Sequence, residues 1–274
     1  MAEQPRLRVF AGPNGSGKST MYEQVRKTKL PNDRRVDLGV YVNPDDIGAM
    51  LRKRGKLYLR RYKMVADQEG LRAFAIASGL LPKPSDQQWF DEGHAVKRNV
   101  FHVHRGADVD RFAQILTQYI VDQLIASKQK CSFETVFSHP SKVAIMERAK
   151  AAGYKVYLYF IATNSPDINK DRVKTRVQRG GHDVPPDRIE SRYYRSLKQL
   201  PTALDLCYHA FMFDNSPSGQ QGMMFGEMKV TSYGRSWFWV TKAIPDWFIK
   251  NYLLATGNPL YLDVARQAME DRKR

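Results

Sequence analysis

Residues 12–19 read Gly-Pro-Asn-Gly-Ser-Gly-Lys-Ser, and this glycine-rich segment constrains the fold more than any other part of the chain. An apolar run at residues 7–11 precedes it, and a helical pattern over residues 19–29 follows it. The segment fits G-x-x-x-x-G-K-[ST], which forms a phosphate-binding loop only where a strand enters it and a helix leaves it. We therefore expect a strand, a tight loop and a helix at the start of the chain.

The backbone of such a loop explains its chemistry. Glycines let consecutive N–H groups turn toward phosphate oxygens, and the following helix adds its positive N-terminal end. The lysine reaches the β- and γ-phosphates and the hydroxyl ligates Mg²⁺, roles that fall to Lys18 and Ser19. A glycine-rich turn that matches by chance is the alternative. The predicted nucleotide-binding residues are Gly12, Pro13, Asn14, Gly15, Ser16, Gly17, Lys18, Ser19 and Thr20.

Strand patterns alternate with helical patterns along much of the chain. Strands are expected at 7–11, 36–42, 131–136, 156–162 and 210–213, with helices at 19–29, 108–128 and 141–152. This alternation predicts an α/β fold, a P-loop kinase core whose central, mostly parallel five-stranded sheet is flanked by helices. Residues 51–106 read as a basic helical insertion and residues 226–274 as an aromatic-rich C-terminal extension. We expect one domain over residues 1–274.

The composition is that of a folded and strongly basic protein. Hydrophobic residues make up 42% of the 274, and the formal net charge is +16. Residues 52–63 hold seven basic and no acidic side chains, and residues 170–198 hold nine basic and four acidic ones, so these stretches carry 12 of the 16 excess charges. Such a charge indicates an anionic partner, either a phosphorylated small molecule or a nucleic acid.

The sequence also excludes several classes. The longest apolar run, residues 156–162, is far shorter than the roughly 20 residues of a membrane-spanning helix. Cys131 and Cys207 form neither a disulfide framework nor a CxxC metal pair. We expect a cytoplasmic protein with no membrane contact.

Acidic residues follow the second expected strand. Asn43, Asp45 and Asp46 stand at its carboxyl end, where open α/β sheets bind ligands. Phosphoryl transfer to an alcohol needs a carboxylate that accepts the hydroxyl proton, and either aspartate could supply it. The other interpretation is a turn in which one aspartate caps the next helix. We expect both interpretations to apply, one to each aspartate.

Glu134 lies at the end of the third expected strand, between Phe133 and Thr135. A buried carboxylate without a partner costs several kcal/mol, so it must meet a cation, a metal or hydrogen-bond donors. Its place at a strand end favours the acceptor or the Mg²⁺ shell. A structural pairing with a neighbouring arginine is the alternative.

Two arginine-rich helices are expected between residues 166 and 198. Each repeats an i, i+4, i+7 spacing that places arginines on one helix face, and the glycine-containing segment 180–186 joins the helices. Such a pair can close as a lid that brings guanidinium groups onto the transferring phosphoryl group. A solvated charged surface is the other interpretation. The arginines are Arg172, Arg176, Arg179, Arg188, Arg192 and Arg195.

Taken in order, GPNGSGKST, VNPDDI, FETVFS and RVKTRVQRGGHDVPPDRIESRYYRSL resemble the zeta toxin family of P-loop kinases. The resemblance implies that ATP and Mg²⁺ are cofactors and that a sugar hydroxyl of UDP-N-acetylglucosamine or a related nucleotide metabolite accepts the phosphate. It also implies a toxin-antitoxin system in which an antitoxin protein covers the nucleotide site.

The resemblance assigns roles to residues of this chain. It makes Asp45 the general base, Glu134 the residue that holds the acceptor, and Arg176 with Arg179 the lid arginines, although Arg172 or His182 could take either place. Asn215 would lie beside the adenine, and Val136 stands where the family often has threonine. The catalytic set is then Lys18, Asp45, Arg176 and Arg179, and the acceptor-binding set is Asn43, Asp46, Glu134 and His182.

Two further functions stay open. The basic charge is compatible with a kinase that phosphorylates RNA or DNA hydroxyls, and a phosphate-binding loop is compatible with a nucleotide-gated binding protein that performs no transfer. The expected partners are therefore a small-molecule phosphate acceptor, an acidic antitoxin and, as second choice, a nucleic acid.

Overall fold

The computed structural model describes residues 4–31, 33–217 and 222–271. The chain forms two compact units, the first made of residues 1–37 with 134–274 and the second of residues 38–133. No helix within these described ranges is long and apolar enough to cross a membrane. Whether the chain is one domain stays a prediction.

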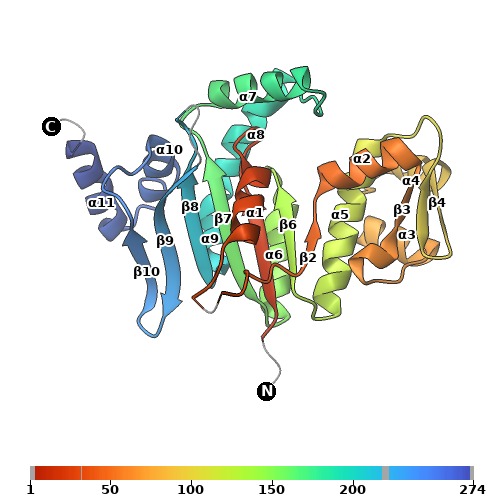
Figure 1. Cartoon of the computed structure of the whole chain (residues 1–274), viewed down its shortest axis with the longest axis horizontal. Helices are drawn as coiled ribbons and strands as arrows, with labels where there is room; N and C mark the ends of the chain where they lie inside the picture. The colour runs from red at the N-terminus through yellow and green to blue at the C-terminus, as the bar shows by residue number, and fades with distance from the viewer. Residues whose placement is uncertain (1–3, 32, 218–221, 272–274) are drawn as a thin grey trace. The chain divides into compact units, whose positions relative to one another are not determined.

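The main sheet consists mostly of parallel strands, and helices pack against it, so the fold is of the α/β class (Figure 1). Its order is β10-β9-β8-β7-β1-β6-β2, so it has seven strands where five were expected. The strands are β1 (Arg6–Ala11), β2 (Val40–Val42), β6 (Cys131–Thr135), β7 (Lys155–Ala162), β8 (His209–Asp214), β9 (Met223–Thr231) and β10 (Gly234–Trp239).

The two additional strands, β9 and β10, form an antiparallel hairpin that extends the sheet beyond β8. A turn at residues 232–233 joins the two strands, and Gly234 pairs with Thr231 across it. The C-terminal extension is therefore partly a continuation of the sheet. An edge pair of this kind is hard to anticipate because its alternation of apolar and polar residues is irregular.

Helices lie on both faces of the first unit's strands. Tyr22 of α1 packs edge-on against Phe10 of β1, whereas Trp247 of α10 packs against Phe160 of β7 on the opposite face. The helices of this unit are α1 (Lys18–Lys27), α6 (Ser141–Ala151), α7 (Pro166–Gln178), α8 (Pro186–Lys198), α9 (Leu200–Leu206), α10 (Asp246–Phe248), the π-helical turn η2 (Ile249–Leu253) and α11 (Pro259–Glu270).

An aromatic cluster fastens the C-terminal segment to the sheet. Trp237 and Trp239 stack at 4.9 Å on β10, and Phe248 meets both rings edge-on. Trp247 is 2% exposed and its Nε1 donates to Asp214 Oδ1 at 3.1 Å. These rings pack across the sheet edge, and Trp247 supports the end of β8.

The second unit contains a small antiparallel sheet as well as helices. Residues 51–106, expected to be helical, include β3 (Lys56–Tyr58), β4 (His94–Lys97) and β5 (Val100–Val103) in the order β3-β5-β4. Strands of three and four residues are too short to give a recognisable alternation, which explains the difference. The remaining elements are α2 (Pro44–Arg54), the 3₁₀ turn η1 (Leu59–Tyr62), α3 (Gln68–Ala77), α4 (Pro84–Gly93) and α5 (Val109–Ala126).

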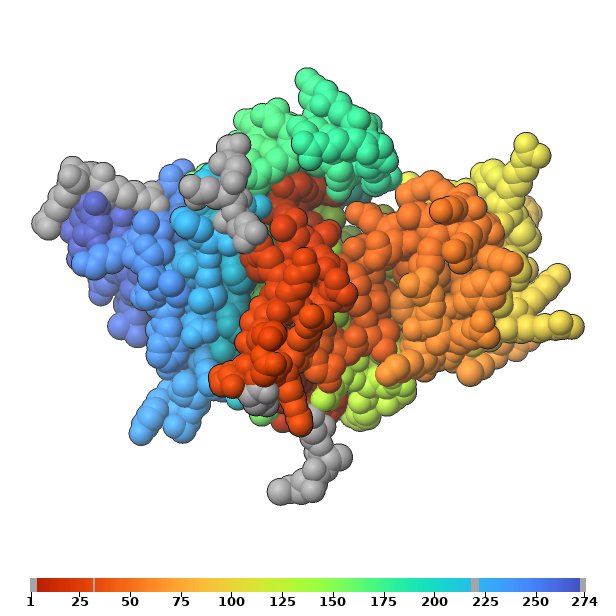
Figure 2. All heavy atoms as spheres, viewed as in Figure 1, coloured from red at the N-terminus to blue at the C-terminus, as the bar shows by residue number. Residues whose placement is uncertain are grey.

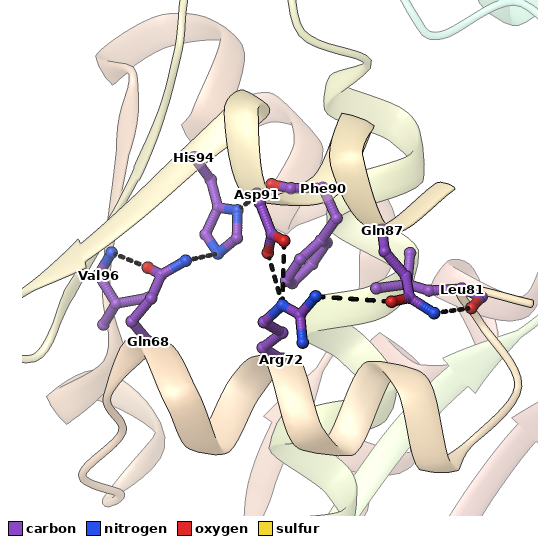
Figure 3. Close-up of polar contacts among 8 residues, drawn as sticks. All are labelled: Gln68, Arg72, Leu81, Gln87, Phe90, Asp91, His94 and Val96. Carbon is purple, nitrogen blue, oxygen red and sulfur yellow. Dashed lines mark hydrogen bonds and ion pairs between the residues drawn. The ribbon is translucent and has the colours of Figure 1, made fainter. Parts of the chain in front are cut away.

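A buried histidine organises the core of this second unit (Figure 3). His94 is 2% exposed, and its Nδ1 lies 2.6 Å from the carbonyl oxygen of Phe90. Nδ1 therefore carries the proton, and Nε2 accepts from Gln68 Nε2 at 3.0 Å. Gln68 Oε1 in turn accepts from the backbone of Val96 at 2.7 Å, and the Arg72–Asp91 ion pair lies alongside.

This arrangement predicts an acid-sensitive second unit. Burial lowers the pKa of His94 below its ordinary value of 6.5, so the unfolded chain takes up a proton more readily than the folded one. The free energy of unfolding should fall as the pH drops below 6.5, and the His94→Phe variant, although less stable, should lose part of this pH dependence. Urea unfolding between pH 5 and pH 7 (about the range over which histidine titrates) measures it. An equally steep dependence in His94→Phe, with exposed His139→Gln as control, contradicts the assignment.

Candidate functional site

The loop between β1 and α1 has the geometry of a phosphate cradle. Gly12 has φ 143°, and a Cβ there would lie 1.9 Å from the carbonyl oxygen of Ile161. Gly17 has φ 97° and precedes the first residue of α1. A side chain at Gly12 would push the loop off β7, so glycine is a steric requirement of the tight turn. The strand, loop and helix expected from the sequence are confirmed.

Side chains from the loop and its neighbours hold it in shape. Lys18, 7% exposed, donates from Nζ to the carbonyl oxygen of Pro13 at 2.8 Å. Asn215 Nδ2 donates to the carbonyl oxygen of Ser16 at 2.8 Å. The side-chain oxygens of Asn14 and Ser16 are buried without hydrogen-bond partners. Unsatisfied buried groups of this kind are expected where a polar ligand completes the site.

Ser19 and Glu134 meet at the first turn of α1. Ser19 Oγ donates to Glu134 Oε1 at 3.0 Å, and Glu134 is 6% exposed at the end of β6. In the described part of the chain no group of three His, Cys, Asp or Glu residues could hold a metal. Mg²⁺ beside a nucleotide commonly uses one or two protein oxygens and takes its other ligands from phosphates and water. The Ser19–Glu134 pair fits that requirement.

The two helices after β7 share a small apolar cluster. Val173 and Val177 of α7 pack with Val184 of the connection and Ile189 of α8. The arginines on these two helices differ in their exposure to solvent. Arg172 and Arg192 are partly buried, whereas Arg179, Arg188 and Arg195 are exposed.

Arg176 is built into the connection between these helices. Its Nη2 donates to the carbonyl oxygen of His182 at 2.6 Å, and its Nε is buried without a partner. A Cβ at Gly181 would lie 2.6 Å from Arg176 Cγ, so glycine makes room for this side chain. His182 itself is exposed and contributes its backbone to Arg176.

Arg172 points instead toward the loop after β8. Its Nη2 donates to the carbonyl oxygen of Pro217 at 3.2 Å, and its Nη1 is buried without a partner. Burial lowers the pKa of Arg172, and Asp214 opposes that shift. The Arg172 side chain therefore contacts the segment after β8, which also carries Asn215.

The predicted acids after β2 lie in the second unit. Asn43 caps α2, because its Oδ1 accepts from the backbone N–H of Asp45 at 2.9 Å, and its Nδ2 donates to Tyr41 Oη at 3.0 Å. The expectation that one aspartate is the cap is therefore wrong, since an asparagine already stands at the cap position. Asp45 and Asp46 occupy the exposed first turn, where a helix favours negative charge.

Two residues near the cradle were missed by sequence reasoning. The backbone of Asn169 on α7 lies against the loop, since a Cβ on Gly15 would be 2.7 Å from its carbonyl oxygen. Lys142 stands in the first turn of α6, just after the β6 segment that carries Glu134, and burial lowers its pKa to about 8. Neither residue belongs to a recognisable motif, because both depend on packing between distant segments.

Part of the chain matches a known protein family. The zeta toxin family model matches residues 96–210. The resemblance inferred from the sequence is therefore confirmed over that range, which includes Glu134 and the arginine-rich helices. The phosphate cradle at residues 12–20 lies outside the match.

Individual proteins that resemble this chain either match a short part of it or share little sequence with it. An uncharacterized protein of Haemophilus influenzae is 39% identical over 70 residues, which is 25% of this chain and 50% of that protein, so the alignment spans half the curated relative. A structure of the PezAT chromosomal toxin-antitoxin system of Streptococcus pneumoniae is similar over 78% of this chain and 70% of that one, with 14% identity and a TM-score of 0.44. The AvrRxo1-ORF1:AvrRxo1-ORF2 complex with sulphate ions is similar over 98% and 77%, with 16% identity and a TM-score of 0.47.

The desolvated amine of Lys142 gives a testable stability effect. Because its folded pKa is about 8 rather than 10.5, the charged form destabilises the fold, and stability should rise as the pH increases from 8 to 10.5. Replacing Lys142 with Met should stabilise the protein at pH 7 by about 2–3 kcal/mol, a gain that disappears near pH 10.5.

Urea unfolding at pH 7 and at high pH measures this difference. Lys242→Met, which removes an exposed lysine of the same unit, is the matched control. A Lys142→Met protein no more stable than the Lys242→Met control at pH 7 would show that the amine is not desolvated.

Proposed function

We propose that this protein is an ATP- and Mg²⁺-dependent phosphotransferase that moves the γ-phosphate to a hydroxyl group of a nucleotide sugar or related nucleotide metabolite. The observation that carries the proposal is the Ser19–Glu134 hydrogen bond beside a complete phosphate cradle. A hydroxyl and a carboxylate so placed would be oxygen ligands for Mg²⁺ next to the phosphates of a bound nucleotide. The family match over residues 96–210 supports the same reaction class.

Each of the residues around the loop would have a separate role in phosphoryl transfer. Lys18 neutralises charge on the β- and γ-phosphates, and the loop N–H groups orient them. Ser19 and Glu134 would hold Mg²⁺, which when bound adds charge neutralisation at the phosphates. Arg176, fixed by the carbonyl of His182, is preorganised to contact the transferred group.

The acceptor half of the proposal rests on the family resemblance. Asp45 would take the proton of the attacking hydroxyl, and its exposed position in the first turn of α2 leaves the carboxylate accessible. Asn43, Asp46, Glu134 and His182 would bind the acceptor. Val136, in place of threonine, favours a relative of UDP-N-acetylglucosamine over that compound itself. We extend the proposal to an acidic antitoxin as protein partner.

Transfer to an acceptor should depend on the cradle and on the base. With γ-labelled ATP and a panel of nucleotide sugars, Lys18→Ala should lose detectable transfer, and Asp45→Asn should lower kcat by about 10²–10⁴-fold. The expected product is an acceptor that carries the label. Label found only in inorganic phosphate, or in RNA or DNA, would contradict the acceptor class, and undiminished transfer by folded Asp45→Asn would contradict its role as base.

Substitution of the two lid arginines, Arg176 and Arg179, should lower kcat by very different factors. Arg176 is anchored within the connection, whereas Arg179 is exposed at the end of α7. Arg176→Ala should lower kcat by about 10³-fold if it contacts the transferred phosphoryl group, and Arg179→Ala should lower it far less. Steady-state kinetics on the two variants, each checked for folding by circular dichroism, measure the contrast. An equal loss of kcat in the two variants would contradict the expectation that the anchored Arg176 contributes more to transfer than the exposed Arg179.

A further inference from the structure

The outer face of the small sheet in the second unit gathers basic side chains from separate strands. The register pairs Lys56 with His102 and Tyr58 with Val100 across β3 and β5, and pairs Lys97 with Val100 across β4 and β5. Paired residues share a face of a sheet. Leu57 and Phe101 occupy the opposite face and are 1% and 0% exposed, so the face with Lys56, Tyr58, Lys97 and His102 points away from the core.

These cations lack acidic partners. Arg52 is neutralised by Asp110, with 2.6 Å between Nη1 and Oδ1. Within the described ranges, no carboxylate forms an ion pair with any of four neighbouring cations, which are Lys56, Arg60, Lys97 and Arg98. Four unpaired cations close together repel one another, and this repulsion is relieved when an anion binds.

Tyr58 fixes the positions of two of these charges. Lys56 Nζ lies 5.4 Å from the centre of the Tyr58 ring, and the guanidinium carbon of Arg60 lies 5.5 Å from it. The pKa of Tyr58 is lowered by Lys56 first and by Arg60 and Arg54 as well, which places all four side chains in one electrostatic field. The ring therefore preorganises the cations through cation–π contacts.

The β4–β5 turn adds Arg98 to the same region. Arg98 and Asn99 have φ of 50° and 60°, in the left-handed region that asparagine adopts more readily than most side chains do. Asn99 uses it to fasten the segment after η1, because its Oδ1 accepts from Ala66 N at 3.0 Å and its Nδ2 donates to the Met64 carbonyl at 2.9 Å. The turn and the Arg60 segment are thus held together, and Figure 2 shows the segment around residue 60 (orange) and the β4–β5 turn (yellow) at the surface.

We propose that this basic face, defined by Lys56, Tyr58, Arg60, Lys97, Arg98 and His102, binds the phosphate backbone of single-stranded nucleic acid. The composition of the face favours a nucleic acid over an acidic protein. Protein interfaces are depleted of charged residues at their centre, whereas nucleic-acid interfaces are polar and strongly basic. Cations spread over a sheet face can follow a flexible phosphate chain. The proposal concerns the second unit and does not depend on phosphoryl transfer.

Fluorescence anisotropy with labelled single-stranded uridine and thymidine 20-mers tests this on the full chain (a length of about one to several binding sites). The variant Lys56→Gln/Arg60→Gln/Lys97→Gln should weaken binding at least about 10-fold and reduce the slope of log K against log salt by about 2, since each contacted phosphate of a single strand contributes about 0.7. The control Lys229→Gln/Lys242→Gln/Lys250→Gln removes the same charge from exposed positions of the first unit and should change the slope little.

Two results overturn the proposal. One is oligonucleotide binding that is absent, or that is equally weakened by the two triple variants when circular dichroism shows both to be folded. The other is polyglutamate that binds through the same three residues as tightly as the oligonucleotide, which would make an acidic protein the occupant. Lys18→Ala should bind the oligonucleotide like the parent protein, so failure of the phosphotransferase proposal and failure of this one are distinguishable.

Discussion

The site depends on how tightly the loop of residues 12–17 is held against its neighbours. The Ile161 carbonyl leaves no room for a side chain at Gly12, Asn169 lies against Gly15, and Asn215 bonds to the Ser16 carbonyl. These three contacts come from β7, α7 and the end of β8. Because the loop is held from three directions, its N–H groups keep their orientation before any ligand arrives, which reduces the reorganisation that binding requires.

The same rigidity explains the unsatisfied groups around the cradle. Buried atoms of Asn14, Ser16, Arg172 and Arg176 have no hydrogen-bond partner. Each costs about 1–3 kcal/mol relative to a satisfied group. A polyanionic ligand would accept hydrogen bonds from Ser16 Oγ, Arg172 Nη1 and Arg176 Nε, whereas Asn14 Oδ1 is itself an acceptor and needs a donor.

Much of the first unit could be predicted because its strands are apolar runs. Residues 7–11, 131–136, 156–162 and 210–213 all lie on observed strands or extend one residue beyond them. The cradle was also predictable, since its spacing reflects backbone geometry. In contrast, β3, β4 and β5 are too short to show a period, and β9 depends on pairing with β8 and β10 on pairing with β9. Tertiary packing, which no local pattern encodes, decides these elements.

The placement of the loop residues could be predicted because one motif dictates the backbone there, whereas their functional roles stay predictions. The contact between Ser19 and Glu134 joins two segments that were each predicted to bear on Mg²⁺. The arginine spacing was less informative, because helical periodicity does not tell which arginine the connection will bury, and only Arg176 is anchored there. The desolvation of Lys142 could not be predicted at all, since it arises from the folded surroundings of an ordinary helix.

The claim that residues 12–20 with Glu134 form a magnesium-nucleotide site is tested most directly by calorimetric titration with a non-hydrolysable ATP analogue, with and without Mg²⁺. We expect one site per chain, tighter binding with Mg²⁺, and loss of most of that magnesium effect in Glu134→Gln. No binding by the folded protein, or a magnesium effect of the same size in Glu134→Gln, would contradict it.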